Sequence, residues 1–325
     1  MHRGRIRTTV AAVALALAGI APAAAQDKIN LLLDWGWLPY HTVFFVAEER
    51  GFYKEAGLEV KVEQGRGSAS SAVVVGQGGF DLGHINITNA AQAIAKGVPL
   101  KSIAVYQTRS SASFISFKDK IELKGPESLK GAKIGSTPGG SDALSLALFT
   151  KIVNVPRESL NVVGLDGAAK RAALLSGSVD VVSGDSHAYG AIVRGTGRVP
   201  SILLLSDYGA PLLGFGFVGN ETFLKAKPEA TKRFLAATRK GFEVAFADPK
   251  ASCILIQSKV LIPGSVEQCV DYFGGLIELS QSPKDASWGK QSDAQWTKLI
   301  DTLTGVGEIK TDKKPADFFT NAYLP

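Results

Sequence analysis

The sequence contains few of the residues that usually bind metal ions or carry out catalysis. It has two cysteines and four histidines among 325 residues. Beyond residue 25 the histidines are His41, His84 and His187, and no two of them have the spacing of a metal-binding pair. The chain has no Gly-x-Ser-x-Gly nucleophile elbow, and no pair of carboxylates is placed as in a glycosidase. We therefore expect no metal, no cofactor, no catalytic residue and no enzymatic activity.

The chain also lacks a strong excess of charge. Its formal net charge is +6, and removal of Arg3, Arg5 and Arg7 with an export signal would lower it to +3. No dense basic stripe is present, so we expect no nucleic-acid partner. After the N-terminal region no stretch is long and apolar enough to span a bilayer, so we expect a mature protein that is not embedded in a membrane.

The N-terminus has the pattern of an export signal. A basic segment is followed by the apolar run Thr8–Ile20 and by the small residues Ala23–Ala25. The apolar run is shorter than the roughly 20 residues of a membrane-spanning helix. We interpret residues 1–25 as a signal peptide cleaved near Ala25, and an uncleaved anchor is the alternative. The residue directly after the cleavage site is not a cysteine, which argues against a lipid anchor.

The two cysteines leave two interpretations open. Cys253 and Cys269 lie in helical-looking sequence on either side of a turn at Ile262–Gly264. An even number of cysteines in an exported protein permits a disulfide. Two buried thiols fit the sequence equally well, because spacing along the chain does not determine the distance between the Cα atoms.

Short apolar strands alternate with helices along most of the chain. Ile29–Leu33 and Leu58–Glu63 read as strands, whereas Thr42–Glu49 and Asn89–Lys96 read as helices. Such alternation is typical of βαβ units and a largely parallel sheet. A mature length of about 300 residues suits two lobes better than one core.

The order of strand, Gly/Ser loop, helix and strand occurs twice. We therefore predict an α/β protein of two lobes, each a mostly parallel sheet flanked by helices. The first lobe comprises residues 27–108 and 215–325, and the second comprises residues 109–214. Two crossing strands near Tyr106–Ser113 and Asp207–Phe217 form the hinge, and the C-terminal helices return to the first lobe.

An aromatic loop follows the first strand. Asp34 is followed by Trp35, Trp37, Tyr40 and His41. Aromatic side chains on a loop at a strand end favour a small-molecule pocket, where indole rings stack on a planar ligand or exclude water. Core packing of the tryptophans and a local hydrogen bond of His41 are the alternatives.

Two loops rich in glycine and serine precede helices. Gly65–Ser71 and Ser136–Ser141 follow strands that we take to be equivalent, and Ser68 or Ser70 is a candidate helix cap. Free N–H groups and hydroxyls at such helix starts favour an anionic or hydrogen-bond-accepting ligand. Ordinary helix starts are the alternative, and the glycines of these loops do not form a dinucleotide-binding fingerprint. The candidate ligand contacts here are Ser68, Ser70, Ser71, Thr137, Gly139, Gly140 and Ser141.

Polar residues also follow three further strands. Asn86 and Gln107 carry amides that donate and accept hydrogen bonds, which suits a polar small molecule. Asp185 would favour a ligand amine or amidine, or it bonds within its own loop. Ser68, His41 and Asp185 together contain the groups of a nucleophilic triad, but no motif supports that arrangement.

Several segments resemble one protein family. The first part of the mature chain resembles the opening of the nitrate/sulfonate/thiamine-pyrimidine group of periplasmic solute-binding proteins. The similar residues are Leu33–Trp35, Pro39, His41 and Phe45–Val60. The resemblance covers nearly the whole mature chain. Further matching segments are Gly76–Leu100, Ser128–Gly135, Leu174–Asp180 and Lys227–Leu235.

The resemblance implies a type II periplasmic binding protein that passes a solute to the permease of an ABC transporter. It implies a monomer in the periplasm that binds its ligand through Asp34–His41, Ser68–Ser71, Asn86 and Ser136–Ser141. Candidate ligands are a pyrimidine-like heteroaromatic compound or a small organic anion such as a sulfonate or carboxylate. Gly36–Leu38 interrupts the pattern of the pyrimidine-binding members. An enzyme on the same scaffold and a ligand-sensing subunit are the alternatives.

Overall fold

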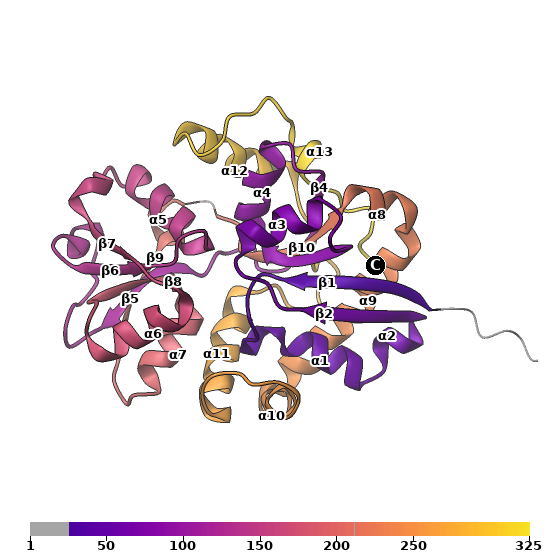
Figure 1. The fold of residues 1–325 in the computed structure, drawn as a ribbon, viewed down its shortest axis with the longest axis horizontal. Helices are drawn as coiled ribbons and strands as arrows, with labels where there is room; N and C mark the ends of the chain where they lie inside the picture. Colours follow the sequence, from indigo (N-terminus) through magenta and orange to yellow (C-terminus); the bar gives the residue numbers. More distant parts are fainter. Residues whose placement is uncertain (1–25, 211) are drawn as a thin grey trace, which may run out of the picture.

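Two five-stranded mixed sheets organise the molecule, each flanked by helices (Figure 1). The computed structural model describes residues 26–210 and 212–325. The proposed signal peptide lies outside these residues. The first sheet has the order β2 (Leu58–Glu63), β1 (Asp27–Leu33), β3 (Leu82–Asn86), β10 (Phe215–Asn220) and β4 (Leu100–Val105). The second sheet has the order β7 (Asn161–Gly164), β6 (Lys133–Ser136), β8 (Val181–Asp185), β5 (Ala112–Phe117) and β9 (Pro200–Leu204).

The two sheets have the same topology. In the first, β1 pairs in parallel with β2 and β3, and β10 lies antiparallel between β3 and β4. In the second, β6 pairs in parallel with β7 and β8, and β5 lies antiparallel between β8 and β9. The antiparallel strand of each sheet is thus the one that enters from the other sheet. The predicted two-lobed α/β fold is confirmed, and the lobes are named first and second after their sheets.

The connections between the lobes meet at Gln107. The segment from β4 to β5 and the segment from η4 (Leu205–Tyr208) to β10 carry the chain across. The Gln107 N–H donates to the Phe215 carbonyl at 3.1 Å, and the Gly214 N–H donates to the Gln107 carbonyl at 2.9 Å. The Gln107 side-chain oxygen also accepts the Phe215 N–H at 3.1 Å. Gln107 therefore joins the two crossing segments into one hinge.

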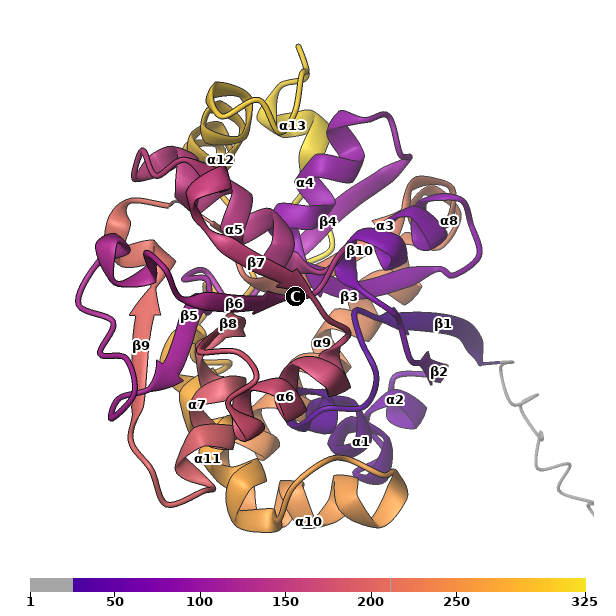
Figure 2. The same ribbon diagram turned by 60° about the vertical axis from the view of Figure 1, so that its left-hand side comes forward.

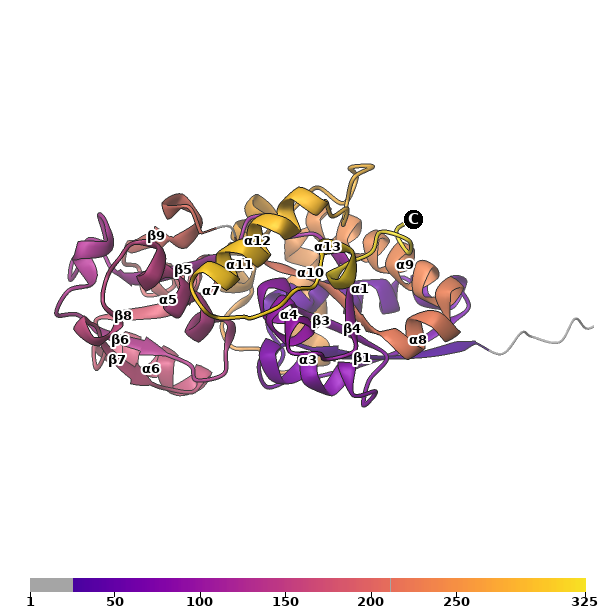
Figure 3. The ribbon, with the colours of Figure 1, turned by 90° about the horizontal axis from the view of Figure 1, so that it is seen from above.

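Most helices of the first lobe surround its sheet. Figure 3 shows α12 and α13 beside α4, and α9 packs against α1 and α2. These helices are α1 (Thr42–Glu49), α2 (Phe52–Glu55), α3 (Ser68–Gly76), α4 (Ile87–Ala95), α8 (Glu221–Ala226), α9 (Pro228–Ala247), α10 (Pro249–Lys259), α11 (Val266–Leu279), α12 (Asp293–Gly305) and α13 (Pro315–Phe318). Among the described residues, no helix has the length and apolar character needed to cross a bilayer.

The second lobe carries α5 (Ser141–Ile152), α6 (Gly167–Ser176) and α7 (Ser186–Arg194). Short 3-10 helices lie at η1 (Pro39–His41), η2 (Pro126–Leu129) and η3 (Arg157–Ser159).

The C-terminal region does not pack on the first lobe alone, because α11 lies against α7 (Figure 2). Arg194 of α7 forms an ion pair with Asp271 of α11 at 2.8 Å, and this pair links the lobes directly.

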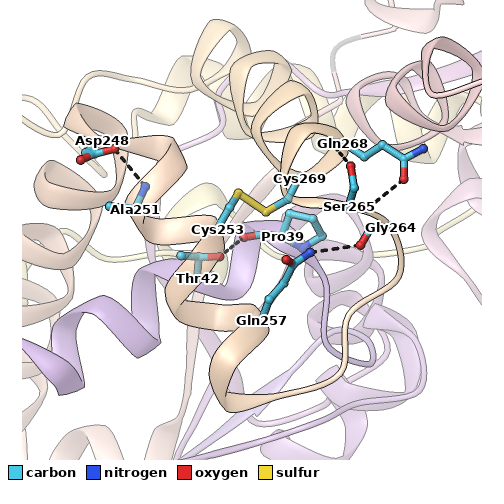
Figure 4. Close-up of a disulfide and its surroundings, with 10 residues drawn as sticks. All are labelled: Pro39, Thr42, Asp248, Ala251, Cys253, Gln257, Gly264, Ser265, Gln268 and Cys269. Atoms are coloured by element: carbon cyan, nitrogen blue, oxygen red, sulfur yellow. Dashed lines mark hydrogen bonds between the residues drawn. A yellow bond between two sulfur atoms is a disulfide. The ribbon is translucent and has the colours of Figure 1, made fainter. Parts of the chain in front are cut away.

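A disulfide clamps the turn between α10 and α11. Cys253 and Cys269 are bonded, with Cα atoms 5.9 Å apart (Figure 4). Ser265 caps α11 by accepting the Gln268 N–H, and Gln257 donates to the Gly264 carbonyl. Of the two interpretations that the sequence left open, the disulfide is confirmed and the pair of buried thiols is wrong.

Candidate functional site

A cavity of about 530 Å³ lies between the two lobes, at the carboxyl ends of β1, β6 and β8. Ligands of open α/β sheets bind at such strand ends. Nine of the predicted contacts line the cavity, namely Asp34, Trp35, Trp37, Tyr40, Ser68, Thr137, Gly140, Ser141 and Asp185. The first and second lobes both contribute, so one ligand can contact both.

Six predicted contacts lie outside the cavity lining: His41, Ser70, Ser71, Asn86, Gln107 and Gly139. Two of them serve α3 instead. Ser70 Oγ donates to the Gly67 carbonyl, and Ser71 Oγ donates to the Leu33 carbonyl, each at 2.8 Å. Asn86 caps α4, and Gln107 belongs to the hinge. Gly139 is exposed in its loop, and its φ of +74° favours glycine.

The start of α3 differs from the prediction that Ser68 or Ser70 caps it. Gly67 occupies the cap position with a φ of +135°, a conformation that other residues rarely adopt. Ser68 is the first helical residue, and its Oγ accepts the Asn86 N–H at 3.1 Å. This bond fixes the tip of α3 against the end of β3.

The loops that we took to be equivalent follow strands in different topological positions. Gly65–Ser71 follows β2, whereas Ser136–Ser141 begins at the end of β6. In the sheet topology, β6 corresponds to β1 and β7 corresponds to β2. The counterpart of Ser136–Ser141 is therefore the aromatic loop after β1. The sequence could not show this, because strand order is set by long-range pairing.

Asp34 is a buried carboxylate at one wall of the cavity. Tyr40 donates to its Oδ2 at 2.6 Å, and His41 Nε2 lies 3.1 Å from its Oδ1. His84 Nδ1 lies 3.6 Å from the same Oδ1, which is longer than a hydrogen bond. Burial alone would raise the pKa of Asp34, but the imidazoles of His41 and His84 hold that pKa well below its usual range. Asp34 therefore carries a negative charge, and among the described residues no lysine or arginine lies within 4 Å of it.

These three residues also have the spacing of possible metal ligands. One ligand atom each from Asp34, His41 and His84 lies within 4.8 Å of the other two. However, the Leu38 N–H donates to His41 Nδ1 at 3.2 Å, so the proton of a neutral His41 is on Nε2. Burial lowers the pKa of His41 and so favours the neutral imidazole. A protonated Nε2 cannot bind a metal ion, and the geometry is that of a hydrogen-bond cluster.

The second lobe holds a different buried carboxylate. Asp142 at the start of α5 forms an ion pair with Lys170 of α6 at 2.7 Å and accepts the Thr137 N–H at 2.8 Å. Lys170 also donates to the Ser183 carbonyl at 2.9 Å and lies over the Tyr189 ring. Although burial would lower the pKa of Lys170, the Asp142 charge raises it above the ordinary value. Both charges are balanced within this lobe.

Asp185 faces the cavity from the start of α7. It occupies the cap position but makes no cap hydrogen bond, and the Ser111 hydroxyl donates to it instead. Burial raises the pKa of Asp185 to about 6, with a contribution from the charges of Asp34 and Asp142 and against the effect of Ser111. Asp185 is thus an acceptor at neutral pH and gains a proton in mild acid.

The lobes touch where Trp35 meets the start of α6. A Cβ atom on Gly167 would lie 2.9 Å from the Trp35 ring, so only glycine leaves room for the indole there. Gly67 and the Gly139 carbonyl make a second approach across the cleft. Trp37, by contrast, packs against Phe45, with the centroids of the two rings 5.2 Å apart. Of the two tryptophans, Trp35 makes the contact between lobes.

Several lining residues were not predicted. Asp142 directly follows the second Gly/Ser loop, and this position in the sequence could have marked it as a residue of the cavity. Lys170 and Tyr189 lie inside helices, where the sequence pattern does not show which side faces the cavity. Tyr272 of α11 and Leu261 of the disulfide-clamped turn come from the distant C-terminal region.

Comparison with curated proteins finds distant relatives that include pyrimidine phosphate synthases and a pyrimidine-binding protein. The chain is 23% identical over 311 residues to a 4-amino-5-hydroxymethyl-2-methylpyrimidine phosphate synthase from Aspergillus parasiticus, covering 92% of this chain and 88% of that protein. It is 24% identical over 285 residues to a formylaminopyrimidine-binding protein from Halalkalibacterium halodurans. This match covers 86% of this chain and 85% of that protein. Synthases among the relatives overturn our expectation that enzymatic activity is absent.

Solved structures show the same fold. The alkanesulfonate-binding protein from Xanthomonas axonopodis pv. citri, bound to MOPS, superposes with a TM-score of 0.69 at 17% identity, covering 91% of this chain and 99% of that one. The resemblance to periplasmic solute-binding proteins seen in the sequence is confirmed at the level of fold. The model of the "NMT1/THI5 like" family matches residues 38–252, and the chain belongs to that family.

Proposed function

We propose that this protein binds a small heteroaromatic solute with N–H donors, such as an aminopyrimidine, in the cavity between its lobes. The observation that carries the proposal is the pair of carboxylates, Asp34 and Asp185, that face one cavity beside Trp35. Carboxylates accept hydrogen bonds from amino and protonated ring nitrogens, and an indole contacts the flat face of such a ring. The pyrimidine phosphate synthase and the formylaminopyrimidine-binding protein among the relatives fit this ligand class.

The charges of the lining favour this ligand over a small organic anion. Three carboxylates line the cavity, those of Asp34, Asp142 and Asp185, with two cations, Lys170 and Arg171. Lys170 is engaged by Asp142. A sulfonate would therefore meet Arg171 but also two carboxylates that have no cation partner within 4 Å among the described residues. Unbalanced like charges repel an anion.

The proposed action is capture and delivery. The two lobes close on the solute because it contacts both. The first lobe comprises residues 27–108 with 215–325, and the second comprises residues 109–214. The closed form then docks on the permease of an ABC transporter. Export to the periplasm through cleavage near Ala25 belongs to the same proposal, and the fold shared with the alkanesulfonate-binding protein supports it.

A thermal-shift series tests the ligand class. A ligand that binds only the folded protein raises the melting temperature. We expect 4-amino-5-hydroxymethyl-2-methylpyrimidine to raise it, and ethanesulfonate and nitrate to leave it unchanged. Trp35→Ala should abolish the shift without changing the ligand-free melting temperature by more than a few degrees. Stabilisation by ethanesulfonate alone would contradict the proposal.

Chemistry on a pyrimidine in the same cavity is a second candidate function. The named synthases among the relatives favour it, and Asp185, with a pKa of about 6, is suited to proton transfer near neutral pH. Mass spectrometry of the pyrimidine after prolonged incubation with the full chain distinguishes the two. A new mass that depends on Asp185 supports the synthase-like function, and an unchanged mass supports capture and delivery.

A further inference from the structure

Behind Asp34 lies a set of polar side chains that do not reach the cavity. His41, His84 and Tyr106 are completely buried, and none of them lines the cavity. They come from three places, η1, β3 and the residue that follows β4. Buried polar groups are costly unless they are hydrogen-bonded, so such a cluster requires an explanation.

The hydrogen bonds of His41 determine which of its nitrogens carries the proton. Its Nδ1 accepts the Leu38 N–H at 3.2 Å, which leaves the proton on Nε2. That proton points toward Asp34 Oδ1, 3.1 Å away. Because the backbone at Leu38 is fixed by η1, the imidazole presents a permanent donor to the carboxylate.

The position of the His84 proton follows from its two polar neighbours, Tyr106 and Asp34. His84 Nε2 lies 2.8 Å from the Tyr106 hydroxyl, whereas Nδ1 has no hydrogen-bond partner among the described residues and lies 3.6 Å from Asp34 Oδ1. A lone pair on Nδ1 would repel the carboxylate, whereas a proton there attracts it. Tyr106 therefore donates to Nε2, and the His84 proton occupies Nδ1 and faces Asp34.

We infer that His41, His84 and Tyr106 are positioning residues that keep Asp34 ionised and oriented as a ligand acceptor. Tyr40 completes the set by donating to Asp34 Oδ2. Tyr106 bonds to His84 behind Asp34 and immediately precedes Gln107, so this set of residues adjoins both the cavity wall and the hinge. The role of Asp34 as a ligand acceptor rests on the proposed function, whereas the arrangement of protons does not depend on any ligand.

Imidazole nitrogen NMR of the full chain without ligand tests the proton arrangement. We expect His41 protonated on Nε2 and His84 protonated on Nδ1. Tyr106→Phe removes one buried hydroxyl at little change in volume, and it should shift His84 toward a mixture of tautomers while His41 is unchanged. Tyr53→Phe is the matched control, because Tyr53 is also buried and its hydroxyl bonds only to Thr238 at 3.0 Å. Wild-type His84 protonated on Nε2 would overturn the inference.

Calorimetry with two pyrimidines tests the consequence for binding. The probes are 4-amino-5-hydroxymethyl-2-methylpyrimidine and the same compound without its amino group. Tyr106→Phe should weaken the amino compound about tenfold, the size of one hydrogen bond to a charged group, and should weaken the other compound less. Tyr53→Phe should change neither affinity.

The outcomes separate the two claims. Equal weakening of both pyrimidines in Tyr106→Phe, or no weakening, would overturn the positioning role. If wild-type protein binds neither probe, the proposed ligand is wrong, and the NMR spectra still decide whether the histidines hold Asp34 as inferred.

Discussion

Asp34 of the first lobe and Asp142 of the second lobe are buried carboxylates at the cavity, and they have different partners. Asp142 in the second lobe is paired with Lys170 at 2.7 Å. Asp34 in the first lobe is held by Tyr40 and His41, which are neutral donors. A paired charge stabilises the fold locally, whereas a charge held by neutral donors remains available to a ligand. Asp34 and Asp142 therefore have different tasks, although the sheets of their lobes share a topology.

The same division is seen at the ends of β3 and β8, which occupy equivalent positions in the two sheets. Asn86 at the end of β3 caps α4 by accepting the N–H groups of Thr88 and Asn89. Asp185 at the end of β8 makes no cap bond to α7 and faces the cavity. One position therefore serves the fold in the first lobe and the cavity in the second.

The largest effect should come from breaking the Asp142–Lys170 pair. Asp142→Asn leaves a buried ammonium group without its anion, and we expect a loss of about 3–5 kcal/mol in the free energy of unfolding. Asp34→Asn leaves no buried ammonium group behind and should cost about 1–2 kcal/mol. Urea unfolding at pH 7 measures both. Equal losses would show that the two carboxylates do not differ as described.

The disulfide is a difference between the lobes that can be removed chemically. It closes a loop with a sequence separation of 16 residues between α10 and α11 of the first lobe. Replacing Cys253 and Cys269 by serine should lower the free energy of unfolding by about 3 kcal/mol, the entropic value for a loop of this size. Urea unfolding of the variant and of wild-type protein under reducing conditions should give the same loss. A loss in only one of them would contradict this account.

His187 of the second lobe should make the stability of the fold sensitive to acid. The side chain of His187 in α7 has no hydrogen-bond partner in the part of the chain that the structure describes, and burial lowers its pKa to about 3. The unfolded chain binds a proton there below pH 6.5, so stability is complete above that pH and is lost as the pH falls. At pH 5 the loss is about 2 kcal/mol.

His187→Leu provides the comparison for this prediction. Between pH 7.5 and pH 5, wild-type protein should lose about 2 kcal/mol more of its free energy of unfolding than the variant. Chemical unfolding at the two pH values measures the difference. Parallel losses in the two proteins would show that His187 is charged in the folded state.

The smallest predicted effect concerns Asp185 and the ligand. Because its pKa is about 6, Asp185 is ionised at pH 7.5 and largely protonated at pH 5. Aminopyrimidine affinity should therefore fall by about tenfold as the pH drops through 6, in addition to any titration of the ligand itself. Asp185→Asn should lack this part of the pH dependence. Calorimetry at both pH values with wild-type and variant protein isolates it, and identical pH dependence would remove Asp185 from the site.

Much of the fold could be predicted because its signals are local. The strand Ile29–Leu33 and the loop after it are visible in the hydrophobic pattern, and Trp35 and Asp34 were singled out by their position at a strand end. Lys170 and Tyr272 were missed, because their approach to the cavity depends on how distant helices pack. The different tasks of Asn86 and Asp185 also depend on three-dimensional geometry, since both are good cap residues in sequence.

The central claim is that the carboxylates of this cavity select a heteroaromatic ligand with N–H donors over an organic anion. Equilibrium dialysis of the full chain against equal concentrations of 4-amino-5-hydroxymethyl-2-methylpyrimidine and ethanesulfonate at pH 7.5 tests it directly. The account predicts that the pyrimidine is retained by the protein in a one-to-one ratio and that ethanesulfonate is not retained. Retention of ethanesulfonate in preference to the pyrimidine would contradict it.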